Sequence, residues 1–264
     1  MLNEFFTEMV EVIFTRGGML DKYIGDGLMA IFGAPVVGSA DADNALYVAN
    51  DMIRALGAFN QRRARRGFDP LEIGIGLATG EVLAGSVGAS KRMEYTAIGN
   101  NVNLAARLES ANKYYGTAVL LAATTVDELK SPAVLRRLDL IQAKGITQPT
   151  WVYESLGHHT SATFPKLAPV IKAYEAGVDC YQRRDWKGSL GHFAAALEMA
   201  PRIGRHASSS TAAATFRPAH RTRGGTGSGS CRRSSAGLRS SAAPRTGPVK
   251  ISPRTKNGFA GIAR

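Results

Sequence analysis

Apolar residues within residues 1–14 recur three and four positions apart, which predicts an amphipathic helix that a Gly-Gly pair then ends. Two short apolar runs follow, at 19–24 and 28–32. They flank a Gly-Asp-Gly tripeptide at 25–27, so we expect a β-hairpin with a glycine-supported turn. The helical spacing returns over 41–66, which predicts a long second helix.

Strand-like and helix-like segments alternate over the next hundred residues. Alternation of this kind predicts an α/β fold, an α+β sandwich in which helices cover a sheet. We expect strands near 71–79, 81–87, 93–97, 118–121, 135–141 and 150–154, and helices near 100–113 and 124–129.

Residues 165–201 show a further helical pattern, typical of two short helices that pack on each other. Its small, aromatic and proline positions resemble one tetratricopeptide repeat. Such arrays usually need about three units to bury a continuous core, so the chain is expected to lose its partner helices after Pro201. The matching residues are Gly177, Tyr181, Trp186, Ser189, Phe193, Ala196, Leu197 and Pro201.

The tail, residues 202–264, is rich in Ser, Ala, Gly, Thr, Pro and Arg and has no periodicity, which predicts a disordered, basic, low-complexity segment. Residues 201–264 hold 13 of the 33 Lys and Arg and none of the 21 Asp and Glu. The first 200 residues therefore carry 20 basic against 21 acidic residues, although the whole chain has a net charge of +12. A nearly neutral body lacks the basic face of a nucleic-acid-binding domain, so no specific nucleic acid is expected as a partner.

Two cysteines, Cys180 and Cys231, can neither form a disulfide framework nor supply a zinc site alone. This fits a reducing compartment, and the expected location is cytoplasmic. The longest apolar stretches, at 28–37 and 118–123, fall short of the roughly 20 residues that a membrane-spanning helix needs.

Four local features carry candidate chemistry. Asn103 and Arg107 lie four residues apart on an expected helix, only about 40° apart around its axis, so both can reach one site. Taken singly, each feature also has a non-functional explanation. The aspartate can serve only the turn, the Asn-Arg pair can be part of a polar helix face, the threonine can be an ordinary strand residue, and the turn lysine can be a solvated surface charge. The features are Lys22-Tyr23-Ile24-Gly25-Asp26, the pair Asn103 and Arg107, Thr96 just before Ile98-Gly99-Asn100, and Lys144-Gly145.

Order and spacing make these features closely resemble the catalytic domain of class III adenylate and guanylate cyclases. The matching blocks are Lys22-x-x-Gly25-Asp26, Gly76-x-x-Thr79-Gly80-Glu81-Val82, the stretch from Glu94 to Glu109, and Lys144-Gly145. The resemblance assigns residues 1–157 to this domain and implies a ferredoxin-like βαββαβ core. It also implies a head-to-tail homodimer or heterodimer of cyclase domains with the site between protomers, and a sensor domain outside this chain. The implied reaction converts a nucleoside triphosphate to a 3′,5′-cyclic monophosphate and pyrophosphate.

The resemblance implies a role for each catalytic candidate. Asp26 matches one of two carboxylates that hold a pair of Mg²⁺ or Mn²⁺ ions, a task for hard oxygen ligands. Asn103 and Arg107 match the pair that orients the ribose and stabilises charge on the transferring phosphorus. Lys144 matches the lysine that binds the terminal phosphates.

Lys22 and Thr96 match the purine-selecting positions of the family. A lysine donates to the N1 acceptor of adenine, and a threonine hydroxyl can accept from its exocyclic amine. Guanine presents a donor at N1 and an acceptor at C6, and guanylate cyclases tend to carry Glu and Cys at these two places. ATP is therefore the favoured substrate, with guanylate cyclase activity as an alternative.

The chain also departs from the family's pattern. In the family, a strand with a phenylalanine-x-aspartate-isoleucine motif precedes the helix that here starts at Leu2, and it supplies the first metal carboxylate. No such strand is present there, and Asp21 and Asp41 lie in the wrong context to replace it. We therefore expect a missing metal ligand and neighbouring strands without a pairing partner, whose unpaired backbone groups are costly.

Three functions remain open at this point. The first is an adenylate cyclase domain with little or no activity of its own. The second is a non-catalytic pairing module that completes a site with an intact partner. The third is a tail that binds nucleic acid or an acidic partner, which the neutral body disfavours. The composition of the tail is also what an out-of-frame reading of G+C-rich DNA produces.

Overall fold

The computed structural model describes residues 1–142, 149–200 and 255–263. Its strands are β1 (Met19–Ile24), β2 (Gly27–Phe32), β3 (Ile75–Ala89), β4 (Arg92–Ile98), β5 (Val119–Ala122), β6 (Leu135–Ile141), β7 (Thr150–Ser155) and β8 (Thr255–Ala263). Its helices are α1 (Leu2–Phe14), α2 (Asp41–Arg65), α3 (Asn100–Tyr115), α4 (Ala123–Asp127), α5 (Leu167–Gln182) and α6 (Trp186–Met199).

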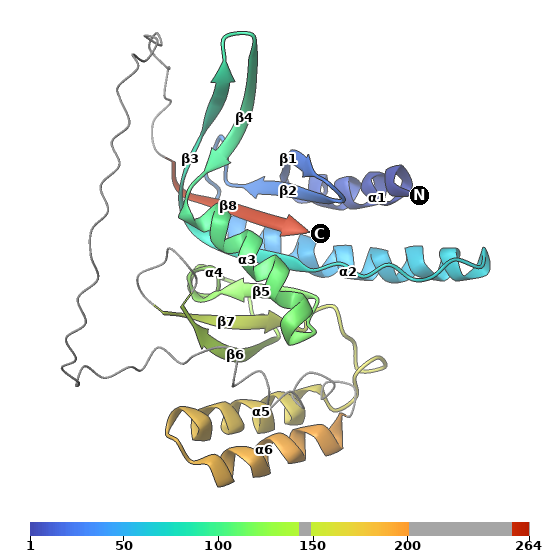
Figure 1. Ribbon diagram of the computed structural model, residues 1–264, viewed down its shortest axis with the longest axis vertical. Coiled ribbons are helices and arrows are strands. Elements are labelled where there is room, and N and C mark those ends of the chain that lie inside the picture. Colours follow the sequence, from blue (N-terminus) through green and yellow to red (C-terminus); the bar gives the residue numbers. More distant parts are fainter. Residues whose placement is uncertain (143–148, 201–254, 264) are drawn as a thin grey trace, which may run out of the picture.

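One mixed sheet forms the centre of the molecule, in the order β1-β2-β8-β3-β5-β7-β6, with β4 paired to β3 outside this path (Figure 1). β3 and β5 are parallel, and the other neighbours are antiparallel. Helices cover both faces, which confirms the predicted α/β sandwich. All six residues of β2 are buried, as expected for a strand with both faces covered.

Helices α1 and α2 cover one face of the sheet. Phe5, Met9 and Ile13 lie one helical turn apart on α1 and are buried there. Burying a side chain of this size contributes about 1.5–3 kcal/mol, so this stripe holds α1 against α2 and β2. A backbone hydrogen bond from the Gly18 amide to the Ile13 carbonyl, at 3.1 Å, closes the helix where the Gly-Gly pair predicted its end.

Helix α3 covers the opposite face and packs very closely on β3. A Cβ atom added to Gly76 would lie 2.1 Å from the Ala105 carbonyl oxygen, so only glycine fits at this position. The close approach fixes the middle of α3, and with it the helix that carries Asn103 and Arg107, relative to the sheet.

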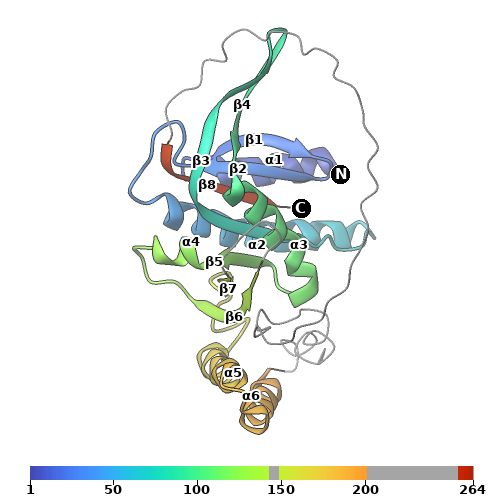
Figure 2. The ribbon, with the colours of Figure 1, turned by 60° about the vertical axis from the view of Figure 1, so that its left-hand side comes forward.

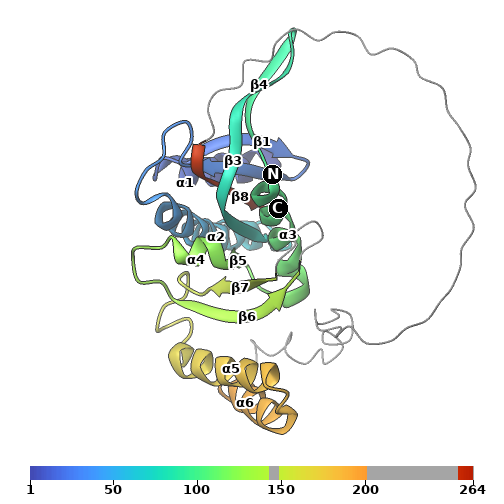
Figure 3. The ribbon, with the colours of Figure 1, turned by 90° about the vertical axis from the view of Figure 1, so that its left-hand side faces the viewer.

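Strands β3 and β4 form a long twisted ribbon that extends away from the rest of the sheet (Figure 3). The expected strands at 71–79 and 81–87 are one continuous strand that begins only at Ile75, so the prediction was wrong for 71–74. Gly80 allows this continuity, because its φ of 154° lets the backbone change direction where the pairing with β8 shifts register.

Strand β8 lies between β2 and β3 and pairs antiparallel with both (Figure 1). For residues 255–263, the expectation of a disordered tail is therefore wrong, and so is the expectation that β2 and β3 lack a partner. The physical reason is that two facing strand edges offer unpaired backbone groups, which almost any extended segment can satisfy. The other tail residues, 202–254 and 264, lie outside the described part of the chain.

Helices α5 and α6 form a hairpin beside β6 (Figure 2), within the residues where a helical pair was expected. The two helices approach closely at Gly177, where an added Cβ atom would meet the Phe193 ring at 2.7 Å. The Ser189 hydroxyl donates to the Gly177 carbonyl at 3.0 Å. The likeness of this pair to a tetratricopeptide repeat stays a prediction. Within the described ranges, no helix has the length and apolarity required to cross a bilayer.

Candidate functional site

The β1–β2 hairpin carries Asp26 at its tip. Ile24 pairs with Gly27, which leaves a two-residue turn of Gly25 and Asp26. Gly25 has φ = 64°, a conformation that glycine adopts without strain and that suits a tight hairpin turn. The turn leaves the Asp26 residue exposed at the end of the hairpin.

A β-bulge interrupts β1 four to five residues before Asp26. Leu20 pairs with Ala30 and Lys22 pairs with Met29, so the intervening Asp21 has no register partner in β2. Successive residues of a regular strand point to opposite faces. A bulge breaks that alternation, and here it lets the Asp21 and Lys22 side chains meet, with Lys22 Nζ 3.7 Å from Asp21 Oδ2.

The Asp21 carboxylate also joins β1 to β4. The Thr96 hydroxyl donates to Asp21 Oδ2 at 2.9 Å, and Thr96 is buried. The Asp21 side chain has no exposed area, and its second oxygen, Oδ1, has no hydrogen-bond partner among the described residues. Burial raises the pKa of the Asp21 carboxyl above its ordinary value, while the Thr96 hydrogen bond and the Lys22 charge act in the opposite direction. Lys22 and Thr96, 74 positions apart in the sequence, are thus gathered on one carboxylate.

Helix α3 starts two residues after β4 ends and carries the other candidate pair. Asn103 is exposed, and Arg107, one turn further, is half-buried. Thr96 near the end of β4 and Asn103 in the first turn of α3 are therefore close in the chain. Lys144 lies outside the described residues.

The carboxylates near the hairpin do not fit a pair of metal ions. In the described part of the chain, no group of three or more His, Cys, Asp or Glu could hold a metal ion. Strand β8, which pairs with β2 on the side away from β1, contains no Asp or Glu. Asp21 is occupied by Thr96 and Lys22, and Asp41 accepts from the Gly38 amide at 2.6 Å. Asp26 alone cannot hold two ions.

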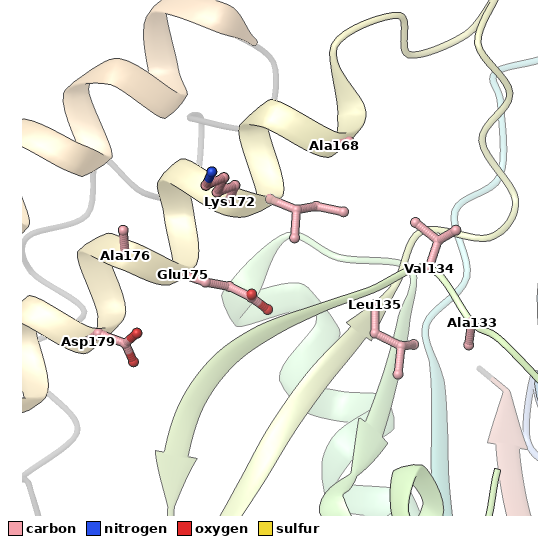
Figure 4. A pocket seen from close by; sticks show the side chains of 9 residues that line it. Ala133, Val134, Leu135, Ala168, Lys172, Glu175, Ala176 and Asp179 are labelled. Carbon is pink, nitrogen blue, oxygen red and sulfur yellow. The ribbon is translucent and has the colours of Figure 1, made fainter.

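A cavity lies away from these residues, at the contact between β6 and α5 (Figure 4). It has a volume of about 610 Å³. Lys172, Glu175 and Asp179 project toward it from α5, opposite Val134 and Leu135. None of the candidate residues lines this cavity. Asp26 and Asn103 are exposed, Lys22 and Arg107 are half-buried, and Thr96 is buried.

Sequence reasoning missed Asp21 as part of the candidate site. It weighed Asp21 only as a replacement metal ligand, and the contact with Thr96 crosses 75 positions of sequence. A one-residue bulge in β1 leaves no reliable local signal. The only local signal for such a role was the position of this acidic residue directly before Lys22.

Comparison with known proteins gives a consistent result. The family model described as "Adenylate and Guanylate cyclase catalytic domain" matches residues 1–154. Adenylate cyclase 1 of Rhizobium meliloti is 36% identical over 157 residues, which cover 60% of this chain and 24% of that protein. This chain therefore spans about a quarter of that relative's length.

Two solved structures share the fold at comparable identity. The guanylyl cyclase Cya2 superimposes with a TM-score of 0.53 at 35% identity, covering 59% of this chain and 78% of that one. The adenylyl cyclase CyaB from P. aeruginosa gives a TM-score of 0.54 at 33% identity, with 59% and 80% covered.

Proposed function

Because the chain belongs to the adenylate and guanylate cyclase catalytic domain family, we propose that it is an adenylate-type nucleotidyl cyclase domain that acts on ATP. The observation that carries the choice of ATP is the cluster of Lys22 and Thr96 on Asp21. An ammonium donor beside a hydroxyl acceptor complements the N1 and exocyclic amine of adenine. Guanine presents the reverse pattern, so the same cluster disfavours GTP.

The reaction proposed for the intact site is an intramolecular displacement. The ribose O3′ forms a bond to the α-phosphorus and the bond from that phosphorus to the bridging oxygen breaks. The products are 3′,5′-cyclic AMP and pyrophosphate, and the 3′-hydroxyl proton passes to solvent. Arg107 supplies a planar guanidinium to the charge that develops on the phosphorus, and Asn103 orients the ribose. Lys144 binds the leaving pyrophosphate.

The chain alone is proposed to have little or no activity. A lone Asp26 does not fit the pair of Mg²⁺ or Mn²⁺ ions that the family uses. Asp26 and Asn103 are exposed and Lys22 and Arg107 are half-buried, so these side chains can contribute to a site completed by a second cyclase domain. The chain is proposed to contribute Lys22, Thr96, Asn103, Arg107 and Lys144 to such a shared site.

The test measures cyclic AMP and cyclic GMP formed from ATP and GTP with Mn²⁺. The purified chain should form neither at a rate well above background. Mixing it with a full-length family member whose own Asn and Arg pair has been replaced should restore cyclic AMP formation. The matched control is this chain with Asn103→Ala and Arg107→Ala, which should not restore it.

Three outcomes discriminate between the alternatives. Strong cyclic AMP formation by the purified chain alone would contradict the incomplete metal site. Absence of rescue by the chain, together with normal folding, would count against the pairing role. Rescue that produces cyclic GMP would replace the adenylate assignment with a guanylate one.

A further inference from the structure

The bulged residue of β1 makes an unusual set of contacts for a buried acid. Asp21 lies in the β-bulge between Leu20 and Lys22, with no exposed side-chain area. Its Oδ2 meets the Thr96 hydroxyl at 2.9 Å and the Lys22 ammonium at 3.7 Å. Burial of a carboxylate is costly unless it is paired and hydrogen-bonded, so these two partners are what keep it in place.

The direction of the Thr96 hydrogen bond follows from the chemistry of the partners. A hydroxyl has one proton to donate and two lone pairs that accept. An ionised carboxylate can only accept, so the Thr96 proton points to Asp21. The neighbouring Lys22 ammonium favours the ionised form of Asp21.

We propose that Asp21 is a specificity-positioning residue, which fixes the Thr96 hydroxyl as an acceptor and the Lys22 ammonium as a donor toward the purine. A hydroxyl whose proton is held by Asp21 can accept from the exocyclic amine of adenine but cannot donate to the C6 oxygen of guanine. The inference rests on the proposed function, because it assumes that Lys22 and Thr96 contact the base of ATP. It assigns Asp21 to the discrimination between ATP and GTP, and not to the chemical step.

The β-bulge accounts for how one side chain reaches both partners. In a regular strand, Asp21 and Lys22 would point to opposite faces, and only one of them could face β4. The register shift between Leu20 and Lys22 removes this restriction. The bulge therefore serves to aim a charged pair at Thr96, which accounts for an otherwise unfavourable buried acid.

The experiment uses isothermal titration calorimetry to measure binding of ATP and of GTP to the complete 264-residue chain mixed with the full-length partner of the rescue experiment, with the partner alone as the blank. Asp21→Asn keeps the shape of the side chain but adds a donor, so the Thr96 proton is free to turn toward the base. The preference for ATP over GTP should fall by about tenfold, the usual effect of one hydrogen bond whose partner is changed. A residue that only supports the fold would weaken both nucleotides alike and leave their ratio unchanged.

Thr96→Val supplies the second arm, because it removes the hydroxyl through which Asp21 is proposed to act. It should lower the preference by itself, and Asp21→Asn should then cause a clearly smaller further loss in the Thr96→Val background, because only the effect through Lys22 remains. Asp69→Asn, in the exposed segment between α2 and β3, makes the same charge change outside the cluster and should leave the ratio unaltered.

The outcomes separate the two levels of the argument. An unchanged ratio in Asp21→Asn, or an equal fall in both backgrounds, overturns the role of Asp21 while the proposed function stands. Absence of binding of either nucleotide to the mixture of the wild-type chain and the partner, beyond that of the partner alone, overturns both. If Asp21→Asn does not fold, the wild-type chain still tests the role of Asp21. The Thr96 hydroxyl proton should exchange with water slowly enough to be seen by NMR, and fast exchange contradicts its hydrogen bond to Asp21.

Discussion

A buried ion pair between β6 and β7 allows a quantitative test of the packing. Arg136 on β6 and Glu154 on β7 are direct register partners, and their side chains are only 6% and 8% exposed. Arg136 Nε and Nη2 donate to Glu154 Oε2 at 2.9 and 2.5 Å. The guanidinium also lies over the Tyr174 ring of α5, 4.4 Å from its centroid, so the pair joins the sheet to the helical hairpin.

Arg136→Met removes both hydrogen bonds and leaves Glu154 buried without a cation. Each bond to a charged group contributes about 1.5–3 kcal/mol. Removing one member of a buried pair typically costs about 3–5 kcal/mol. We therefore expect the free energy of unfolding to fall by about 3–5 kcal/mol, measured by urea denaturation at neutral pH with folding followed by circular dichroism.

The loss should depend on pH in a defined direction. Burial raises the pKa of Glu154, and the Arg136 charge opposes that rise. Without Arg136, the folded state holds the Glu154 proton more tightly than the unfolded state does. The free energy of unfolding of the variant should then decline as the pH rises above the ordinary value of 4.5.

Two control variants separate charge from packing. Replacing both members, Arg136→Met with Glu154→Leu, should return the stability to within about 1 kcal/mol of wild type, because no uncompensated charge remains. Arg92→Met breaks the exposed pair with Glu94 and should cost about 0.5 kcal/mol or less. A cost below about 1 kcal/mol for Arg136→Met alone, or an equal cost for the double variant, would refute the reasoning.

Three further predictions concern the framework. In thermal unfolding, Gly76→Ala should destabilise the protein by about 1–3 kcal/mol or more, because its Cβ would meet the Ala105 carbonyl oxygen at 2.1 Å. Its control in the same assay is Gly57→Ala on α2, which has open space around it and should stabilise the protein by about 0.5–1 kcal/mol. Asp43 is buried, which disfavours its charge, but two backbone amides hold its pKa below the ordinary value of 3.8. Asp43→Asn should therefore cost about 1–3 kcal/mol at neutral pH, and urea titrations should show that difference shrinking as the pH falls through the folded pKa. Deleting 255–263 should speed amide hydrogen exchange in β2 and in the first half of β3, and unchanged exchange would show that β8 does not hold this position in solution.

Much of the fold follows from local sequence signals. The helical spacing in residues 1–14 and 41–66, and the Gly-Asp-Gly turn at 25–27, predicted α1, α2 and the β1–β2 hairpin close to their observed bounds. These signals are readable because amphipathic periodicity and turn chemistry depend on residues only a few positions apart. The placement of Asp26 at a hairpin tip, and of Asn103 and Arg107 on one helix, was predicted from local signals of the same kind.

Other features depend on contacts between distant segments, and only the tertiary structure decided them. The joining of Lys22 to Thr96 through Asp21 needs a register shift in β1 and the packing of β1 beside β4. The insertion of β8 between β2 and β3 brings together residues more than 170 positions apart. Sequence composition could not indicate this pairing, because ladder hydrogen bonds join backbone groups that every residue carries.

By itself, the sequence determined the family, the α/β class and the residue types of the candidate site. The tertiary structure decided which of those residues are in contact. It also placed β8 between β2 and β3, where the sequence had predicted strands without a pairing partner. The difference has one physical reason. Local conformation is encoded in side chains that are neighbours in sequence, whereas strand order, bulges and buried hydrogen bonds are decided by the free energy of contacts that form only when the whole sheet assembles.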